Sequence, residues 1–414
     1  MQALMPEAQH YQTLFTVQPA LGEPDHLRAW RSQQLTAFIQ QGFPTPQAED
    51  WRYTRLTGWN NRAFTLPAQP QIAVTYPDYE LVIVDGYWVK TAAELPAGLT
   101  VMDWQAAYPA MAAQATPLAA LNAAFMQAGV VVQVAPGVQL TQPLRVLWLS
   151  SAQADNTMQH PRLWVQLGAG SKLTLVEETA SLAQTAHFAN SIGEITLDTG
   201  AQLTHYRVQG SSTRSLNLAE LTVQQAAGSR YESVMLALGG SLARQEIQVH
   251  LRGPQAECSL IGLYLAQGRQ HLDFHTRIDH HAEACISREN YRGILAEASR
   301  AVFSGKIMVH QDAQQTDSNQ QNKTLLLSDN AEIDTKPQLE IFADDVKCAH
   351  GATVGQLESE ALFYLQARGI ALPEARTLLM QAFAQQVLQV LPDTPAAARL
   401  SVQVAAKLAA FNRG

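Results

Sequence analysis

The sequence predicts a mainly β chain whose centre is a solenoid of stacked turns. Between about residues 130 and 350, short runs rich in Val, Ile, Leu, Thr and aromatic residues alternate with glycine-containing turns. Similar turn sequences recur at intervals of 25 to 30 residues, and self-similarity in this range is typical of solenoids and propellers. No strong amphipathic helix interrupts these runs, which indicates that the strands stack directly on one another.

The N-terminal region, residues 1–125, is predicted to mix helices with short strands. Between Asp25 and Gln41 the apolar residues recur with helical spacing, and Gly42 and Pro44 then end the helix. From Pro67 to Gly98, short β-like runs are broken by prolines. We therefore expect this region to flank the solenoid.

The central region, residues 126–355, is predicted to form the solenoid itself. Four comparable turns begin with glycines spaced 30, 28 and 25 residues apart, at Gly170, Gly200, Gly228 and Gly253. The next turn, 29 residues further on at Ala282, lacks the glycine. Each unit is expected to hold two or three short strands and to stack on the next. A propeller blade typically needs about 40–45 residues, so an ordinary β-sandwich is the remaining alternative.

The C-terminal region, residues 356–414, is predicted to be helical. Apolar residues step by helical intervals through two segments, first Leu379, Phe383, Val387 and Leu391, then Val404, Leu408 and Phe411. Prolines separate the two segments. Such apolar stripes usually face a core, so these helices are expected to cap the solenoid or dock a partner.

Composition narrows the class of protein. The formal net charge is -8 and no block of Lys and Arg stands out, so a nucleic-acid partner is not expected. No run approaches the roughly 20 apolar residues of a membrane span, and the first residues do not resemble a secretory signal. The three cysteines Cys258, Cys285 and Cys348 are widely spaced, which fits a reducing compartment. We therefore expect a cytoplasmic protein without a membrane partner.

Cys348 and His350 are the sharpest candidates for chemistry. Residues two apart in a strand project from the same face, and a thiolate beside an imidazole can bind iron or zinc. Two ligands do not complete a site, so the others must come from elsewhere in the chain or from another chain. The alternative is a buried cysteine beside a surface histidine. Cys258 and Cys285 lie among small and apolar residues and are expected to pack in the core.

A second group of polar residues has two interpretations. It consists of His271, Asp273, His275, Asp279, His280, His281 and Glu283. The group is either a metal patch or the solvated outer face of a strand ladder, and the solvated face is favoured. The polar stretch Gln311–Asn322 either ladders between turns or forms a loop. A P-loop, a G-x-G-x-x-G after a strand and a G-x-S-x-G elbow are all missing, so the sequence does not predict an enzyme.

A family resemblance runs almost continuously through the C-terminal half, over Ser287–Leu295, Ala301–Ile307, Gln320–Ser328, Ala331–Gly355 and Glu360–Gly369. These segments resemble the SufB/SufD family of iron–sulfur cluster assembly proteins. Upstream, Glu49–Thr54 (Glu-Asp-Trp-Arg-Tyr-Thr) and the modest length are more similar to the SufD branch than to SufB.

The resemblance implies a right-handed parallel β-helix flanked by helical regions. It also implies a non-catalytic scaffold subunit that pairs with a SufB-like subunit and recruits a SufC-like ABC ATPase through its C-terminal helices. The positions matching the family's ligands are Cys348 and His350, which would hold iron or a nascent cluster at the SufB interface. The isolated chain is expected to bind no cofactor stably, and the complex to hold a transient iron–sulfur cluster or iron.

Two alternatives stay open. The first is a β-helix carbohydrate-active enzyme, a lyase or esterase, with the His271–Glu283 region as its acid/base or metal site. The second is a homodimer of the isolated chain, because an exposed strand edge at a solenoid end is a natural pairing surface.

Overall fold

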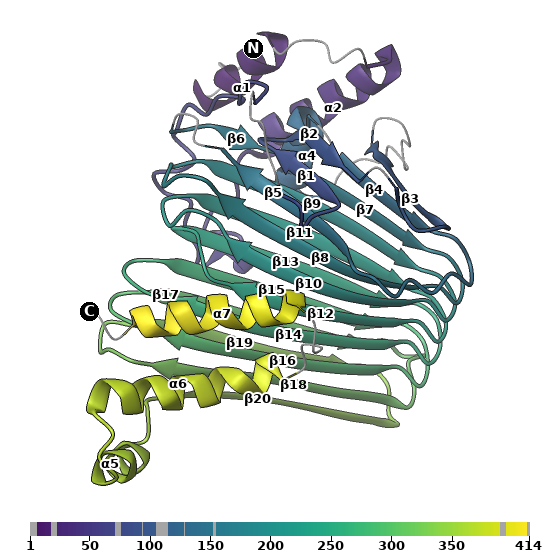
Figure 1. The fold of residues 1–414 in the computed structure, drawn as a ribbon. Coiled ribbons are helices and arrows are strands. Elements are labelled where there is room, and N and C mark those ends of the chain that lie inside the picture. The colour runs from purple at the N-terminus through teal and green to yellow at the C-terminus, as the bar shows by residue number, and fades with distance from the viewer. Residues whose placement is uncertain are drawn as a thin grey trace.

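The computed structural model describes residues 6–17, 23–70, 76–92, 94–104, 115–127, 129–151, 155–389 and 395–411. Across these ranges the chain is mostly β, with a parallel solenoid at its centre and helices toward both termini (Figure 1). The predicted fold class is therefore confirmed. Each turn of the solenoid contributes one strand to each of two facing sheets, and each strand of an inner turn pairs with the corresponding strands of the two neighbouring turns.

The first sheet contains β1 (Leu81–Val84), β2 (Tyr87–Thr91), β5 (Leu144–Ser150), β8 (Lys172–Ser181), β10 (Gln202–Gly210), β12 (Arg230–Ala237), β14 (Glu257–Ala266), β16 (Ile286–Leu295), β18 (Thr316–Leu326) and β20 (Val346–Gly355). Its order is β2-β1-β5-β8-β10-β12-β14-β16-β18-β20. The second sheet contains β3 (Leu99–Asp103), β4 (Gly129–Val134), β6 (Met158–Gln159), β7 (Arg162–Leu167), β9 (Phe188–Leu197), β11 (Leu216–Gln225), β13 (Leu242–Leu251), β15 (His271–His280), β17 (Arg300–Val309) and β19 (Glu332–Ile341). Its order is β19-β17-β15-β13-β11-β9-β7-β4-β3, and β6 pairs with β9.

Within the described residues the solenoid has eight turns, from β4–β5 to β19–β20. Neighbouring strands in it are parallel, whereas the pairs β1–β2 and β3–β4 at its first end are antiparallel. Continuous parallel pairing over so many turns excludes the β-sandwich alternative, because the sheets of a sandwich are antiparallel.

Each repeat holds two long strands, which corrects the expectation of two or three short ones. In the sequence only Leu173–Val176 has strand character, yet β8 continues to Ser181. Its residues pair with β10 in unbroken register, from Lys172 with Gln202 to Ala180 with Gly210. The polar residues of this strand would not form a strand by propensity alone. Backbone hydrogen bonds to the neighbouring strands on both sides keep them extended.

The turns explain most of the recurring glycines. Gly170, Gly200 and Gly228 have φ values of 64, 69 and 63°, in the left-handed region that glycine adopts without steric cost. In the turn that lacks a glycine, Ala284 takes φ 55° instead. Gly253 is needed for space, because a Cβ atom there would lie 2.1 Å from the backbone nitrogen of Ala227.

The interior of the solenoid is an apolar core with an aromatic stack near its last turns. The ring centroids of Tyr264 and Phe274 lie 5.0 Å apart, and those of Tyr291 and Phe303 lie 5.1 Å apart. Tyr264 faces Gly293 across the β14–β16 pair, and a Cβ atom on that glycine would come within 2.0 Å of the tyrosine ring. The glycine therefore makes room for the ring of the neighbouring turn.

Helices from the C-terminal region cover the outer face of the first sheet (Figure 1). They are α6 (Leu372–Leu388) and α7 (Pro395–Ala410), and α5 (Ser359–Ala367) precedes them. The buried residues of α7 are Leu400, Val404 and Leu408, of which the last two were predicted, and the predicted Phe411 is partly buried just beyond the helix. In α6 the buried stripe is Met380, Ala384 and Val387, so Leu379 does not lie at its centre, and Leu391 lies outside the described residues.

The N-terminal region packs on the outer face of the second sheet. It contributes α1 (Pro6–Val17), α2 (Asp25–Gln41), the 3-10 helix η1 (Glu49–Trp51) and α4 (Pro117–Phe125). The helix α2 has the predicted bounds, and Gly42 ends it with φ 71°. Arg31 is buried and donates to the carbonyl oxygens of Ala124 and Met126, which ties α2 to the end of α4.

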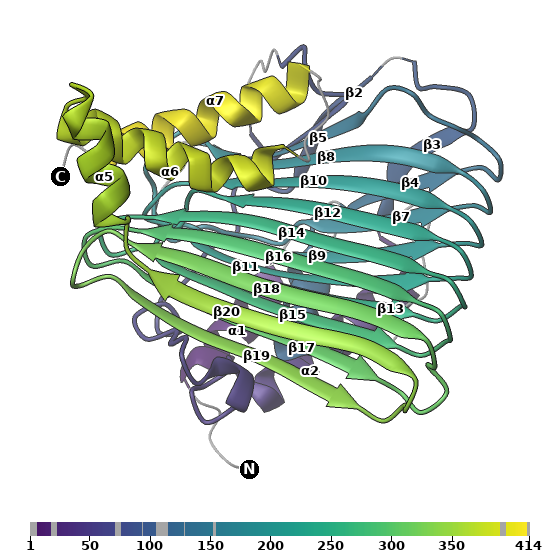
Figure 2. The same ribbon diagram turned by 90° about the horizontal axis from the view of Figure 1, so that it is seen from below.

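The two ends of the solenoid differ. At the first end the outermost strands β2 and β3 are antiparallel to their neighbours, and the core residues Leu81 of β1 and Leu99 of β3 are buried. At the other end, β19 and β20 each pair along one edge only, and all of their residues are half-buried or exposed. Figure 2 looks onto this end, which we call the open end. Among the helices that the structure describes, none is long and apolar enough to cross a membrane.

Candidate functional site

Cys348 and His350 lie on the last strand of the open end. Cys348 pairs in register with Ser318 of β18, and His350 pairs with Gln320. Cys348 packs beside the apolar cluster that contains Ile307, so it points toward the solenoid interior. Alternation along the strand places His350 on the same inner face. Because no further turn covers β20, the thiol stays partly accessible and the imidazole is exposed.

Polar side chains continue beneath both residues into the solenoid. Below Cys348, Ser287 Oγ donates to Ser318 Oγ at 2.9 Å, and His280 Nε2 lies 2.9 Å from Ser287 Oγ. Below His350, Gln320 Nε2 donates to Glu289 Oε2 at 2.6 Å. These hydrogen bonds fix the side chains of Ser318 and Gln320, which lie next to the two candidate ligands on the neighbouring strand.

The environment favours the protonated forms of Cys348 and Glu289. Burial raises the pKa of the Cys348 thiol, and the carboxylate of Asp317 raises it further. Burial also raises the pKa of Glu289 to about 7. A thiol of this kind needs a metal ion or a base to become a thiolate ligand. Among the described residues, no third His, Cys, Asp or Glu joins Cys348 and His350 in a cluster.

The residues of the second polar group lie in three places, which are the outer face of β15, the solenoid interior and the turn that follows β15. His271, Asp273 and His275 lie on the outer face of β15, while His280 points inward and bonds Ser287. Asp273, Asp279 and His280 are buried rather than solvated, so the favoured interpretation of a solvated face is wrong for these three residues. The predicted residues therefore do not converge on one place in the described structure, although Asp279 and His281 lie in a cluster that could hold a metal ion.

The cover over Asp273 comes from the segment Glu49–Thr54. Thr54 Oγ1 donates to Asp273 Oδ2 at 2.6 Å, and Arg244 Nη1 lies 2.5 Å from the same oxygen. Arg244 also donates to the carbonyl oxygen of Asp50 at 2.9 Å, and its guanidinium lies 4.2 Å from the ring centroid of Trp51. This short N-terminal segment thus completes the outer face of the second sheet.

His281 belongs, with Asp279 of the same predicted group, to a cluster whose other members the sequence did not indicate. It neighbours Asp279, His310 of the next turn and His250 of the previous one. The repeat interval could have revealed this cluster, because His250, His281 and His310 lie 31 and 29 residues apart at corresponding places in successive turns. Burial lowers the pKa of His281 to about 4, and Arg252 adds to this effect.

An apolar surface lies on the C-terminal helices beside the open end. No residue of α5 is buried. Phe363 and Tyr364 on α5 are 73% and 56% exposed, and Leu372 and Leu378 on α6 are 43% and 41% exposed. A cluster of exposed large apolar side chains is typical of a protein–protein contact.

The chain matches one described family over more than half of its length. Residues 149–383 match the family described as SUF system FeS cluster assembly, SufBD core domain. The matched range begins near the end of β5 and reaches into α6, and it includes both Cys348 and His350.

Three relatives extend this similarity. The iron–sulfur cluster assembly protein SufD of Escherichia coli (strain K12) is 32% identical over 374 residues, covering 87% of this chain and 88% of the relative. An iron–sulfur cluster assembly SufBD family protein of Synechocystis sp. is 30% identical over 380 residues, with 84% of each chain covered. The chloroplastic protein ABCI7 of Arabidopsis thaliana is 34% identical over 272 residues, covering 64% of this chain and 57% of that protein.

The stacked parallel turns, the family match and the coverage of both N-terminal and central regions agree with one another. The chain therefore belongs to the SufBD family of SUF-system iron–sulfur cluster assembly proteins, with its similarity on the SufD side.

Proposed function

We propose that this chain is a non-catalytic scaffold subunit of a SufBCD-type complex, in which it pairs with a SufB-like subunit and recruits a SufC-like ABC ATPase. The observation that carries the proposal is the placement of Cys348 and His350 together on the inner face of the last, uncovered strand. Family membership supports a role in iron–sulfur cluster assembly. The further roles rest on the two surfaces considered next.

The open end fits a partner that continues the solenoid. The outer edges of β19 and β20 present backbone N–H and C=O groups that a second solenoid can pair with. Such pairing would bring the partner's side chains over Cys348 and His350, which have one soft and one borderline donor atom. The partner then supplies the remaining ligands, so the site forms only in the complex.

The apolar surface of α5 and α6 fits the second partner. The chain has no P-loop motif, so energy from ATP must enter through another subunit. Phe363 and Tyr364 offer large apolar contacts on a helix that has no buried residue of its own. We assign this surface to the SufC-like ATPase, whose movement would act on the adjacent open end.

Iron, sulfide and the nascent cluster are cargo in this proposal. The raised pKa of Cys348 keeps its thiol protonated in the isolated chain, and two ligands hold a metal ion weakly. The cluster would therefore be bound transiently in the complex and passed on. We place the protein in the cytoplasm, in keeping with its free cysteines.

Anaerobic iron and sulfide reconstitution of the co-purified complex tests the ligand pair. Cys348→Ala and His350→Ala should each lower the yield of cluster without changing complex assembly. Thr353→Ala is the matched control, because Thr353 is exposed on the opposite face of the same strand. Wild-type cluster yield from the Cys348→Ala/His350→Ala double variant, with assembly intact, would remove the pair from the mechanism.

Pull-down with a SufC-like ATPase tests the helical surface. Phe363→Ser together with Tyr364→Ser should abolish capture of the ATPase while pairing with the SufB-like subunit persists. Val402→Ser on α7 makes the same type of change at a side chain that is 68% exposed, and it should leave capture unchanged. Equal loss of capture in both variants would contradict the assignment.

Sedimentation of the isolated chain tests the use of the open end. Without its partner the chain is expected to form a homodimer at chain concentrations of tens of micromolar. Addition of a SufB-like subunit should dissociate that homodimer. A strict monomer that also fails to bind the SufB-like subunit would refute the assignment of this end.

A further inference from the structure

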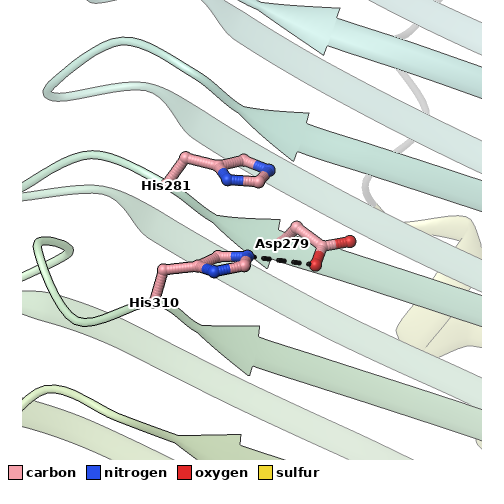
Figure 3. A group of neighbouring side chains, drawn as sticks. All are labelled: Asp279, His281 and His310. Atoms are coloured by element: carbon pink, nitrogen blue, oxygen red, sulfur yellow. Dashed lines mark hydrogen bonds and ion pairs between the residues drawn. The ribbon is translucent and has the colours of Figure 1, made fainter.

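We propose that Asp279, His281 and His310 bind a divalent first-row transition-metal ion on the outer side of the second sheet (Figure 3). This site is separate from the pair at the open end, because Cys348 and His350 belong to the inner face of the first sheet. The proposal does not depend on the assembly function argued above.

The solenoid repeat brings the three residues together. Asp279 is the penultimate residue of β15, His281 follows the end of that strand, and His310 follows the end of β17. The backbone N–H of His310 donates to the carbonyl oxygen of His280 at 3.0 Å, so the two turns are held in register. The ligands therefore sit on hydrogen-bonded strand ends rather than on a long loop, which favours a defined geometry.

The distances suit one shared ion. One ligand atom from each of the three residues lies within 4.8 Å of the other two. The imidazole rings of His281 and His310 stack with their centroids 4.3 Å apart and an interplanar angle of 15°. His310 Nε2 lies 3.4 Å from Asp279 Oδ1. Ligands of a zinc ion bind at about 2.0–2.2 Å from the metal, so small side-chain rotations would close the set.

The donor set indicates the class of ion. Two imidazole nitrogens and one carboxylate oxygen suit Zn²⁺ or Fe²⁺, with further positions left for water. His310 is 41% exposed, so an ion has a route from solvent. The carboxylate of Asp279 is only 1% exposed, which places its charge at the closed side of the site.

A fourth residue orients the set. His250 Nδ1 lies 3.2 Å from His281 Nε2, and its ring stacks on His281 with centroids 5.5 Å apart. His250 Nδ1 also lies 3.7 Å from Asp279 Oδ2. Contacts of this kind fix ring orientation in metal sites, so His250 acts as a positioning residue.

Arg277 competes with the ion for the carboxylate. Its Nε donates to Asp279 Oδ2 at 2.7 Å, and its Nη2 donates to Oδ1 at 2.9 Å. The guanidinium neutralises the buried charge of Asp279 while no ion is bound. An incoming cation must share this carboxylate and approach a fixed positive charge, so removing Arg277 should strengthen metal binding.

Zinc titration of the metal-free chain by calorimetry tests the proposal. The Cys348→Ala/His350→Ala background removes the donors at the open end, and one Zn²⁺ ion per chain should still bind with micromolar or tighter affinity. In that background, His281→Asn and His310→Asn should each weaken binding at least tenfold. His26→Asn, at an exposed residue of α2, is the control and should bind zinc as its parent does.

A gain of affinity separates a metal site from a structural role. Arg277→Gln should tighten zinc binding severalfold, which loss of folding would not produce. Cobalt substitution adds a second measurement, because a ligand-bound Co²⁺ ion gives visible absorption bands that should vanish in His310→Asn. The proposal is overturned if no zinc binds below 100 µM, or if both histidine variants bind as the parent does.

Discussion

Replacing Asp273 by asparagine tests the buried charge pair that fastens the N-terminal segment to the solenoid. Asp273 is fully buried, and its partner Arg244 is 2% exposed. Burial by itself would raise the pKa of Asp273, but Arg244 and hydrogen bonds from His275 and Thr54 together hold it well below its usual range. The aspartate is therefore charged, and its removal leaves Arg244 buried without that counter-charge.

The expected loss is large for a single isosteric change. Breaking a buried ion pair by removing one partner typically costs about 3–5 kcal/mol. The asparagine oxygen can still accept from Thr54, and Glu246 still lies 3.1 Å from Arg244. We therefore expect the lower end, about 3 kcal/mol of unfolding free energy. Residues 49–54 should detach first, because their contacts converge on this pair.

Urea titration and hydrogen exchange together measure this effect. Asp273→Asn should lower the unfolding midpoint, and the backbone amides of residues 49–54 should exchange faster under native conditions. Asp317→Asn is the matched control, since Asp317 pairs with Arg288 at 2.8 Å but both side chains are more than 40% exposed. An exposed pair contributes about 0–1 kcal/mol. Equal losses in the two variants, or unchanged exchange in residues 49–54, would refute the reasoning.

Three further variants probe the interior and the helical cover. Since burial raises the pKa of Glu289 to about 7 from 4.5, the folded chain keeps a proton that the unfolded chain releases between these pH values. Glu289 should therefore contribute a loss of about 3 kcal/mol of stability as pH rises through that window. Urea titrations at pH 5 and 8 should show this contribution as the difference between the wild type and Glu289→Gln. Gly293→Ala should cost about 1–3 kcal/mol through its clash with Tyr264, whereas Gly210→Ala, with its nearest neighbour at 3.5 Å, should change thermal stability little. Met380→Ala should cost about 2–5 kcal/mol by leaving a cavity under α6, and unchanged protease resistance of that helix would argue against it.

The fold class could be predicted because the solenoid repeats its turn chemistry. Left-handed positions at Gly170, Gly200 and Gly228 leave a visible interval in the sequence. Strand length could not be predicted, because long-range pairing and not propensity keeps the polar residues extended. The stretch Gln311–Asn322 illustrates this point, since its second half forms part of β18 with Gln320 and Asn322 buried.

Site residues were predictable only where they lie close in sequence. Cys348 and His350 share a face by simple strand alternation. The cluster around His281 requires residues about one repeat away, so His310 has no local signal. The burial of Asp273 was hidden because its cover, Thr54, lies 219 residues away in the chain.

The difference between the two ends of the solenoid bears on head-to-tail association of separate chains. The parallel register of the repeat ends at the antiparallel strands β2 and β3, whereas β19 and β20 keep that register at their free edges. Solenoids that ended in such parallel strands at both ends would polymerise head to tail into fibres. The short antiparallel strands β2 and β3 therefore break the repeat at one end, which works against head-to-tail addition there.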